Sequence, residues 1–174
     1  MTRRGIWTGI FLIFAIFLGF GIKQYVAVNS QGQEAVIEKF FDRNQWVRAE
    51  NVKFKVLKVE NHSTTREKRI KVFLRIQQDP RVNIGGIKGN VNIADASWLN
   101  IPYSISNPSE TVRKVSGHPF TEQELKNSKE KIMVLDFDSP VDNYKQRQRT
   151  ARVSFLLVDD QAKKMIKYSL PVNL

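Results

Sequence analysis

Residues 51–78 read NVKFKVLKVENHSTTREKRIKVFLRIQQ, and this stretch decides the fold class. Apolar and basic side chains alternate on both sides of the polar turn at residues 61–67. Because successive side chains of a strand point to opposite faces, the pattern predicts two strands, each with an apolar and a basic face. The turn between them predicts a long antiparallel pair. The apolar parity slips after Val56 to Leu57 and Val59, which indicates a β-bulge or burial on both faces.

Further strands are expected at 91–105, 131–138, 151–158 and 163–174, the last two forming a hairpin around Asp159-Asp160-Gln161. The apolar run at 132–137 is typical of a central strand covered on both faces. Roughly six or seven strands with polar turns and few helices predict a mainly β protein, an antiparallel immunoglobulin-like β-sandwich. We expect its core to include Ile70, Val72, Leu74, Ile132, Val134, Val153, Phe155 and Leu157.

Two short helices are expected. Thr121 and Glu124 have the spacing of a capping box, and Phe120 with Leu125 has that of a hydrophobic staple, which predicts a helix at about 122–129. Residues 34–46 carry apolar side chains at helical spacing (Val36, Ile37, Phe40 and Phe41). This second helix would pack on the domain, skim a membrane or dock a partner.

The amino-terminal segment has the pattern of a membrane anchor. Residues 5–22 carry no charge, and eighteen helical residues span about 27 Å, close to the bilayer core. We expect the anchor contacts to be Trp7, Phe11, Phe14, Phe17 and Tyr25. The alternative is a cleaved signal peptide, but the run is long for one and the following residues form poor cleavage sites.

The positive-inside rule gives this anchor an orientation. Arg3 and Arg4 precede the apolar run and Lys23 alone follows it closely, which favours a cytoplasmic amino terminus. The predicted organisation is a cytoplasmic stub at 1–4, the anchor at 5–22, a linker with the short helix at 23–50, and an extracytoplasmic sandwich at 51–174. The localisation expected is the cell membrane, in a single-pass arrangement.

Composition restricts the chemistry and the partners. The chain has no cysteine, which excludes a disulfide framework and most zinc or thiol chemistry, and favours a bacterial exported protein. Beyond residue 23, 25 Lys and Arg stand against 17 Asp and Glu, a net charge of about +8. Such a domain is attracted to a lipid surface, an anionic wall polymer or an acidic envelope protein. Nucleic acid is not expected as a partner outside the cell.

The segment YKQRQRTAR, at 144–152, is the candidate site for such a partner. In an extended segment Lys145, Arg147 and Arg149 would project from one side, next to Tyr144, and could bind phosphates or an acidic protein. The alternative is a solvated basic edge that prevents strand-to-strand aggregation.

Catalytic motifs are weak. Asp136, Asp138 and His118 are the residues that a phosphate-directed hydrolase would use, but no nucleophile motif accompanies them. Asp136, Asp138 and Asp142 lack the glycine and glutamate of a calcium loop, and no cofactor or metal is predicted. The glycine-rich residues 80–91 lack the Gly-Lys-Ser/Thr ending of a phosphate-binding loop.

The sequence therefore predicts a non-enzymatic binding or assembly module on a membrane anchor, which engages an envelope protein or anionic polymer through a basic face. One alternative is a scaffold subunit of a secretion or conjugation machine. The other is the envelope hydrolase described above. An anchor helix followed by an immunoglobulin-like external domain is common among bacterial surface proteins, an analogy of architecture that does not identify the partner.

Overall fold

The predicted hairpin is present in the computed structural model, as β3 (Val52–Asn61) and β4 (Glu67–Gln78). The two strands pair antiparallel, and the register shifts between Val56 and Lys58, so that Leu57 is the extra residue of a β-bulge. Ile70, Val72, Leu74 and Ile76 are fully buried on one face of β4. The hairpin, its bulge and its apolar face are confirmed.

The structure describes residue 7 and residues 16–26, 36–101, 107–108, 112–145, 151–159 and 161–174. Its contacts divide the chain into two compact units, Met1–Val36 and Ile37–Leu174.

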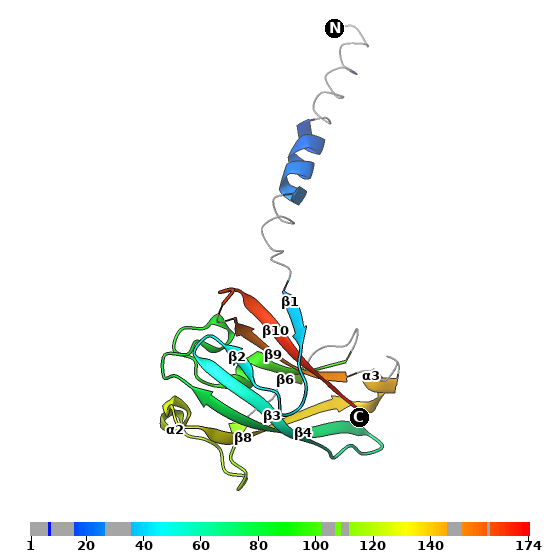
Figure 1. Cartoon of the computed structure of the whole chain (residues 1–174). Helices are drawn as coiled ribbons and strands as arrows, with labels where there is room; N and C mark the ends of the chain where they lie inside the picture. Colours follow the sequence, from blue (N-terminus) through cyan, green and yellow to red (C-terminus); the bar gives the residue numbers. More distant parts are fainter. Residues whose placement is uncertain are drawn as a thin grey trace. The chain divides into compact units, whose positions relative to one another are not determined.

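The larger unit is a β-sandwich of two five-stranded sheets. The remaining strands are β1 (Ile37–Phe40), β2 (Val47–Ala49), β5 (Ser97–Asn100), β6 (Asn107–Pro108), β7 (Val112–Arg113), β8 (Lys131–Pro140), β9 (Ala151–Val158) and β10 (Met165–Val172). One sheet has the order β1-β10-β9-β5-β6 and the other β2-β3-β4-β8-β7. Figure 1 shows β9 and β10 in one layer and β3, β4 and β8 in the other. The sandwich is not purely antiparallel, because β1 pairs with β10 in parallel.

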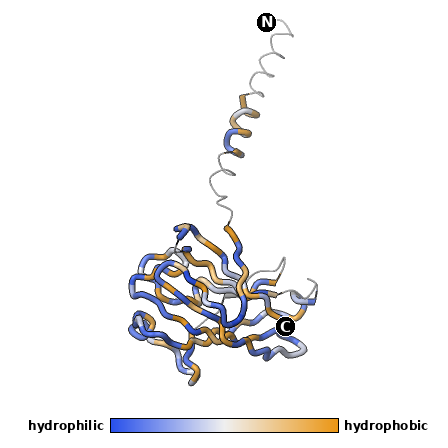
Figure 2. The backbone as a smooth tube through the Cα atoms, in the orientation of Figure 1, coloured by the Kyte–Doolittle hydropathy of each residue, from blue (hydrophilic) through white to orange (hydrophobic). Residues whose placement is uncertain are grey.

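The core lies between the two sheets. Phe54 of β3 and Phe155 of β9 are fully buried there, with ring centroids 4.7 Å apart. The ring of Phe41 meets that of Phe54 edge-on at 5.8 Å. Figure 2 shows hydrophobic and hydrophilic residues alternating along the strands, as a sheet with one buried face requires.

The predicted inward face of β8 is wrong. Ile132 is 36% exposed and Val134, although buried, lies outside the core cluster, whereas Met133, Leu135 and Phe137 face the core. An unbroken apolar run carries no parity, so the pairing with β4 decides which side chains turn inward. In that register Leu135 lies opposite Val72, a core residue.

The predicted helix at 34–46 is also wrong. Residues 37–40 form β1, which pairs along β10 from Ile37↔Ile166 to Phe40↔Ser169. The sandwich accordingly begins at Ile37 and not at residue 51. The apolar residues have helical spacing, yet the segment is a strand, because parallel pairing with β10 satisfies the hydrogen-bonding groups of its backbone.

Ionic contacts hold β1 in place. Lys39 Nζ lies 3.0 Å from Asp159 Oδ2, which also accepts a hydrogen bond of 2.7 Å from the hydroxyl of Tyr168. The amide of Ala162 donates to the other oxygen of the same carboxylate. Hydrogen bonds from Ala162, Tyr168 and Lys39 hold the pKa of Asp159 well below its usual range.

Short helices and 3-10 turns connect the strands. They are η1 (Ile84–Gly86), η2 (Ile93–Ala96), α2 (Glu122–Lys126) and α3 (Val141–Lys145). The predicted capping box of α2 is confirmed, since Thr121 accepts from the amide of Glu124 and the Glu124 carboxylate accepts from the amide of Thr121. The helix ends at Lys126, and the Nζ of Lys131 donates to the carbonyl oxygens of Glu124, Leu125 and the capping residue Asn127.

In the amino-terminal unit, residues 16–26 are α-helical. Large apolar side chains are exposed along this helix, among them Phe17 at 72% and Phe20 at 67%. Within the described residues, no helix has the length and apolar character needed to cross a membrane. Phe11 and Phe14, with most of the first half of the predicted anchor, lie outside the described residues.

Candidate functional site

Four cations gather on the outer surface of the second sheet. Arg48 of β2, Lys53 and Lys55 of β3, and Arg75 of β4 alternate with core residues and therefore point away from the core. In the register of the sheet, Arg48 lies directly opposite Lys53, and Lys55 lies directly opposite Arg75. We call these four residues, together with Trp46, the basic face.

Like charges directly opposite each other destabilise a sheet, so the basic face carries an energetic cost. Among the described residues, no carboxylate lies within salt-bridge distance of Arg48, Lys53 or Lys55. Arg75 has one distant partner, with its Nε 3.6 Å from Glu130 Oε1. Trp46 offsets part of the cost, since the Nζ atoms of Lys53 and Lys55 lie 5.3 and 5.0 Å from its ring centroid.

Further along the same surface the charges are mixed. Glu60 lies opposite Lys71, and its carboxylate contacts both Lys58 and His62. The hydrogen bonds from Lys58 and His62 keep the pKa of Glu60 low, so this acid stays ionised beside its bases. Unneutralised positive charge is therefore concentrated at the end of the sheet that holds β2.

On the opposite sheet, by contrast, two cations of neighbouring strands share a carboxylate partner. On its outer surface the Glu38 carboxylate lies 3.3 Å from Arg152 Nε and 3.5 Å from Lys167 Nζ, and accepts a hydrogen bond from the hydroxyl of Ser169. Burial raises the pKa of Glu38, but the Ser169 hydrogen bond and the two cations outweigh it and the pKa is lowered. This cluster holds β1 against β10 and β9, and each of its two cations has a carboxylate partner.

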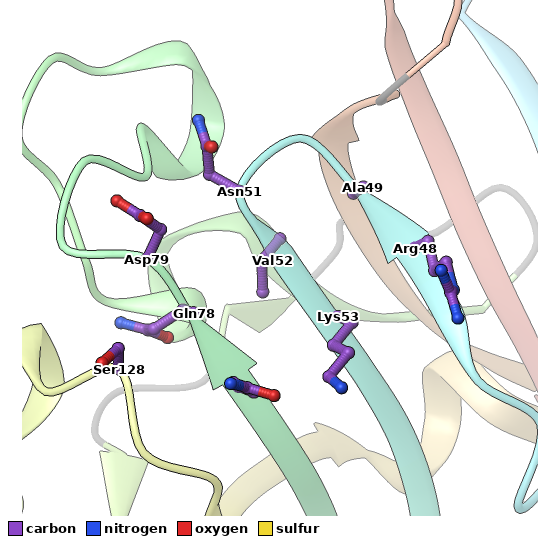
Figure 3. Close-up of a pocket in the computed structure, with 9 residues that line it drawn as sticks. Arg48, Ala49, Asn51, Val52, Lys53, Gln78, Asp79 and Ser128 are labelled. Atoms are coloured by element: carbon purple, nitrogen blue, oxygen red, sulfur yellow. The ribbon is translucent and has the colours of Figure 1, made fainter.

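A hollow of about 420 Å³ lies beside the basic face, at the end where β3 begins and β4 ends. This size falls within the usual range of small-molecule pockets. Its walls are formed by Arg48, Ala49, Asn51, Val52, Lys53, Gln77, Gln78, Asp79 and Ser128. Figure 3 shows Asn51, Asp79, Gln78 and Ser128 on one side of Val52, and Arg48 and Lys53 on the other. The hollow thus joins a hydrogen-bonding wall to two cations of the basic face.

The hydrogen-bonding wall is held rigidly. Gln78 is only 1% exposed, and its amide nitrogen donates to the carbonyl oxygens of Val91 at 2.8 Å and Leu125 at 2.9 Å. Its Oε1 is buried and accepts no hydrogen bond from the described part of the chain. Asp79 accepts hydrogen bonds from the guanidinium and the amide of Arg81, which lower the pKa of Asp79 to about 2. At neutral pH this wall therefore presents the ionised carboxylate of Asp79, paired with the Arg81 guanidinium.

The segment predicted as the site does not have the predicted geometry where it is described. Tyr144 and Lys145 belong to α3 and are not extended. Tyr144 is 7% exposed, its hydroxyl donates to the Leu174 carbonyl oxygen at 3.0 Å, and Lys68 Nζ lies 4.7 Å from its ring centroid. Lys145 is exposed, whereas Arg147 and Arg149 lie outside the described residues. Tyr144 is thus a packing residue of the carboxyl terminus, because the last residues of the chain cover it.

The residues of the hydrolase alternative lie on different elements. Asp136 and Asp138 are on β8, opposite Lys71 and Arg69 of β4, where they balance the charge of the neighbouring strand. His118 is exposed in the loop after β7, and its carbonyl oxygen accepts from the amide of Lys114. Within the described ranges, no group of three potential metal-ligating side chains lies close enough to hold a metal ion.

Sequence reasoning found part of the basic face and missed the rest. The alternation at 51–78 predicted Lys53, Lys55 and Arg75 on a common basic surface. Trp46 was missed because it ends the segment interpreted as helical, and Arg48 because it fell in the region up to residue 50 that was assigned to a linker. The pattern Val47-Arg48-Ala49, apolar on both sides of a cation, was the available signal for a third strand.

Comparison with known proteins supports the architecture alone. No protein-family model and no curated protein matches this chain. The chain resembles the solved structure of an uncharacterized β-sandwich protein from Clostridium difficile 630 with a TM-score of 0.54 and 12% sequence identity. The match covers 81% of this chain and 98% of that chain. At this identity the likeness establishes the β-sandwich fold and carries no function.

Proposed function

We propose that this protein is a membrane-anchored, extracytoplasmic binding module without catalytic activity, which engages a phosphate-bearing polymer through its basic face. The observation that carries the proposal is the opposition of Arg48 to Lys53 and of Lys55 to Arg75, with three of these four cations lacking a carboxylate partner among the described residues. A bound polyanion would remove the repulsion that this arrangement builds into the sheet.

The geometry of the basic face favours a chain of anions over a single one. Lys53 and Lys55 are two residues apart on β3, about 7 Å at ~3.3 Å per residue, and opposed side chains on neighbouring strands are about 5 Å apart. A flat grid of cations at this spacing can contact successive charges of a flexible polymer. Trp46 adds an apolar surface for the uncharged links between those charges.

The membrane anchor in this proposal is supported by the uncharged residues 5–22 and by the exposure of Phe17 and Phe20 on the helix at 16–26. Exposed apolar side chains of this size need a lipid or protein environment. The proposed orientation places the amino terminus in the cytoplasm, from the distribution of Arg3, Arg4 and Lys23. The full-length protein should stay with membranes after an alkaline carbonate wash and retain its first residues. A soluble mature protein that begins near Val28 would refute the anchor.

We also propose that the sandwich is of the immunoglobulin-like type, and the strand order supports this. In such domains the strands A-B-E-D form one sheet and the C, F and G strands form the other. The order β3-β4-β8-β7 corresponds to the first set, and β10-β9-β5-β6 corresponds to G-F-C-C′, with β1 beside the G strand. The strand β2 is an addition at the edge of the first sheet.

The polymer proposal is tested on the full-length protein in neutral detergent, with inorganic polyphosphate as the probe, at low and high salt. The variant Arg48→Gln/Lys53→Gln/Lys55→Gln removes three charges from the basic face. The matched control, Lys145→Gln/Arg147→Gln/Arg149→Gln, removes three charges from the segment at 144–152. At about 0.5 kcal/mol for each exposed contact, we expect roughly tenfold weaker binding for the first variant and less than about twofold for the control.

Each outcome decides between surfaces or partners. If the first variant still binds polyphosphate and the control does not, the binding site is the segment at 144–152 and not the basic face. Binding to phosphatidylglycerol vesicles without binding to polyphosphate, and with none to phosphatidylcholine vesicles, would replace the polymer by the lipid surface. Binding that does not weaken with salt would contradict an electrostatic surface altogether, because exposed charges are screened over about 8 Å at physiological salt.

A further inference from the structure

The hollow beside the basic face has two chemically different ends. Arg48 and Lys53 belong to both the hollow and the basic face, and they offer only donors to a ligand. On the other side of Val52, the Asp79 carboxylate is an acceptor, and Asn51 and Ser128 can accept or donate (Figure 3). A ligand that fits both ends carries an anion at one end and hydrogen-bond donors at the other.

Gln78 gives this wall of the hollow a fixed shape. Both of its amide hydrogens are used by the carbonyl oxygens of Val91 and Leu125, which fixes the orientation of the amide. Its Oε1 is left as a buried acceptor without a partner in the described chain. This oxygen has almost no accessible surface, so Gln78 shapes the wall, and contacts to a ligand come from its exposed neighbours Asn51 and Ser128 and from Asp79.

The two ends also discriminate between kinds of polyanion. A second anion next to the first would find no free cation there, because the Arg81 guanidinium is bound to both oxygens of the Asp79 carboxylate. A hydroxyl group at the same position would instead donate a hydrogen bond to an acceptor of the wall. Asn51 and Ser128 are exposed at the rim and can contact the same hydroxyl groups as either donors or acceptors.

We infer that the hollow binds a polyol phosphate unit, with the phosphate at Arg48 and Lys53 and the hydroxyl groups of the adjoining polyol at Asn51, Asp79 and Ser128. This inference rests on the proposed function, and it names the polymer class: a phosphodiester chain whose links carry hydroxyl groups. The hollow selects such a unit, and the basic face next to it holds the neighbouring phosphates of the same chain.

The test compares two monoesters of equal charge, glycerol 3-phosphate and methyl phosphate, which differ in the hydroxyl groups. Each is titrated into the ¹⁵N-labelled full-length protein in neutral detergent, and the amide signals of Asn51, Gln77, Gln78 and Ser128 are followed. One net hydrogen bond corresponds to about fivefold in affinity, so glycerol 3-phosphate should bind about fivefold more tightly. The shifts should be concentrated on these amides.

Two conservative variants locate the preference. Asn51 has a φ of 60°, which glycine adopts without strain, so Asn51→Gly removes the side chain and keeps the turn. Ser128→Ala removes the exposed hydroxyl at the rim. The double variant should reduce the preference to less than about twofold and leave polyphosphate binding within about twofold of the parent. The matched variant Lys55→Gln, outside the hollow, should weaken polyphosphate binding and keep the preference.

Equal affinity for the two monoesters would overturn the inference, and so would a preference that the double variant leaves intact. Neither result affects the proposed function, provided polyphosphate still binds in a salt-dependent manner. If polyphosphate does not bind at all, the proposed function fails, whatever the monoesters do.

Discussion

Truncation of Phe155 to alanine should be among the most destabilising single changes in the sandwich. The ring is fully buried, 4.7 Å from that of Phe54 and 6.3 Å from that of Phe41. An aromatic side chain of about 150–250 Å² at ~25 cal/mol per Å² gives about 4–6 kcal/mol, and the methyl group that remains recovers part of this. Phe155→Ala should therefore lower the free energy of unfolding by about 3–5 kcal/mol, as for other buried phenylalanines.

The measurement is urea-induced unfolding of the full-length protein in neutral detergent, followed by circular dichroism and extrapolated linearly to zero urea. Ile132→Ala is the control, because Ile132 is 36% exposed on the outer surface of β8. We expect a loss below about 1 kcal/mol for this control. A loss below about 1 kcal/mol for Phe155→Ala, or equal losses for both variants, would refute the assignment of the core face.

Three further changes test the contacts of individual residues. Asp159→Asn should weaken the dependence of stability on acid pH. The pKa of Asp159 is lower in the folded state than its unfolded value of about 3.9. The stabilisation that the ionised carboxylate provides is therefore present above pH ~4 and lost as the pH falls further. Urea midpoints at pH 7, 4 and 3 measure this, and a variant with the parent's pH dependence would contradict it. Arg48→Gln should leave the urea midpoint unchanged or raise stability by up to about 1 kcal/mol, because it removes the repulsion with Lys53; a clear loss would show that Arg48 is structural. Thr121→Ala should destabilise α2 by about 0.5–2 kcal/mol through loss of its cap, seen as faster amide exchange at Glu124, whereas unchanged exchange would show that the cap is redundant.

Local patterns predicted those features that depend on neighbouring residues. The alternation at 51–78 specified β3, β4 and their faces, and the change of parity after Val56 specified the bulge. Thr121 and Glu124 specified the start of α2, because a capping box needs only the three residues that follow the cap. The hairpin of β9 and β10 followed in the same way from two alternating runs and a polar turn.

Contacts between distant segments set the remaining features, and no local pattern encodes them. Residues 37–40 have helical spacing, yet they form a strand because β10, the last strand of the chain, offers them a ladder. The same holds for β8, whose apolar run fits either face until β4 sets its register, and for Tyr144, which the carboxyl terminus covers. The basic face combines the two cases: alternation placed Lys53, Lys55 and Arg75 on the surface, and the pairing of β2 with β3 added Arg48 opposite Lys53. Side-chain direction within a strand is a property of a few consecutive residues. Strand pairing depends instead on which distant backbone groups meet, and the sequence encodes this pairing only through the packing of the whole core.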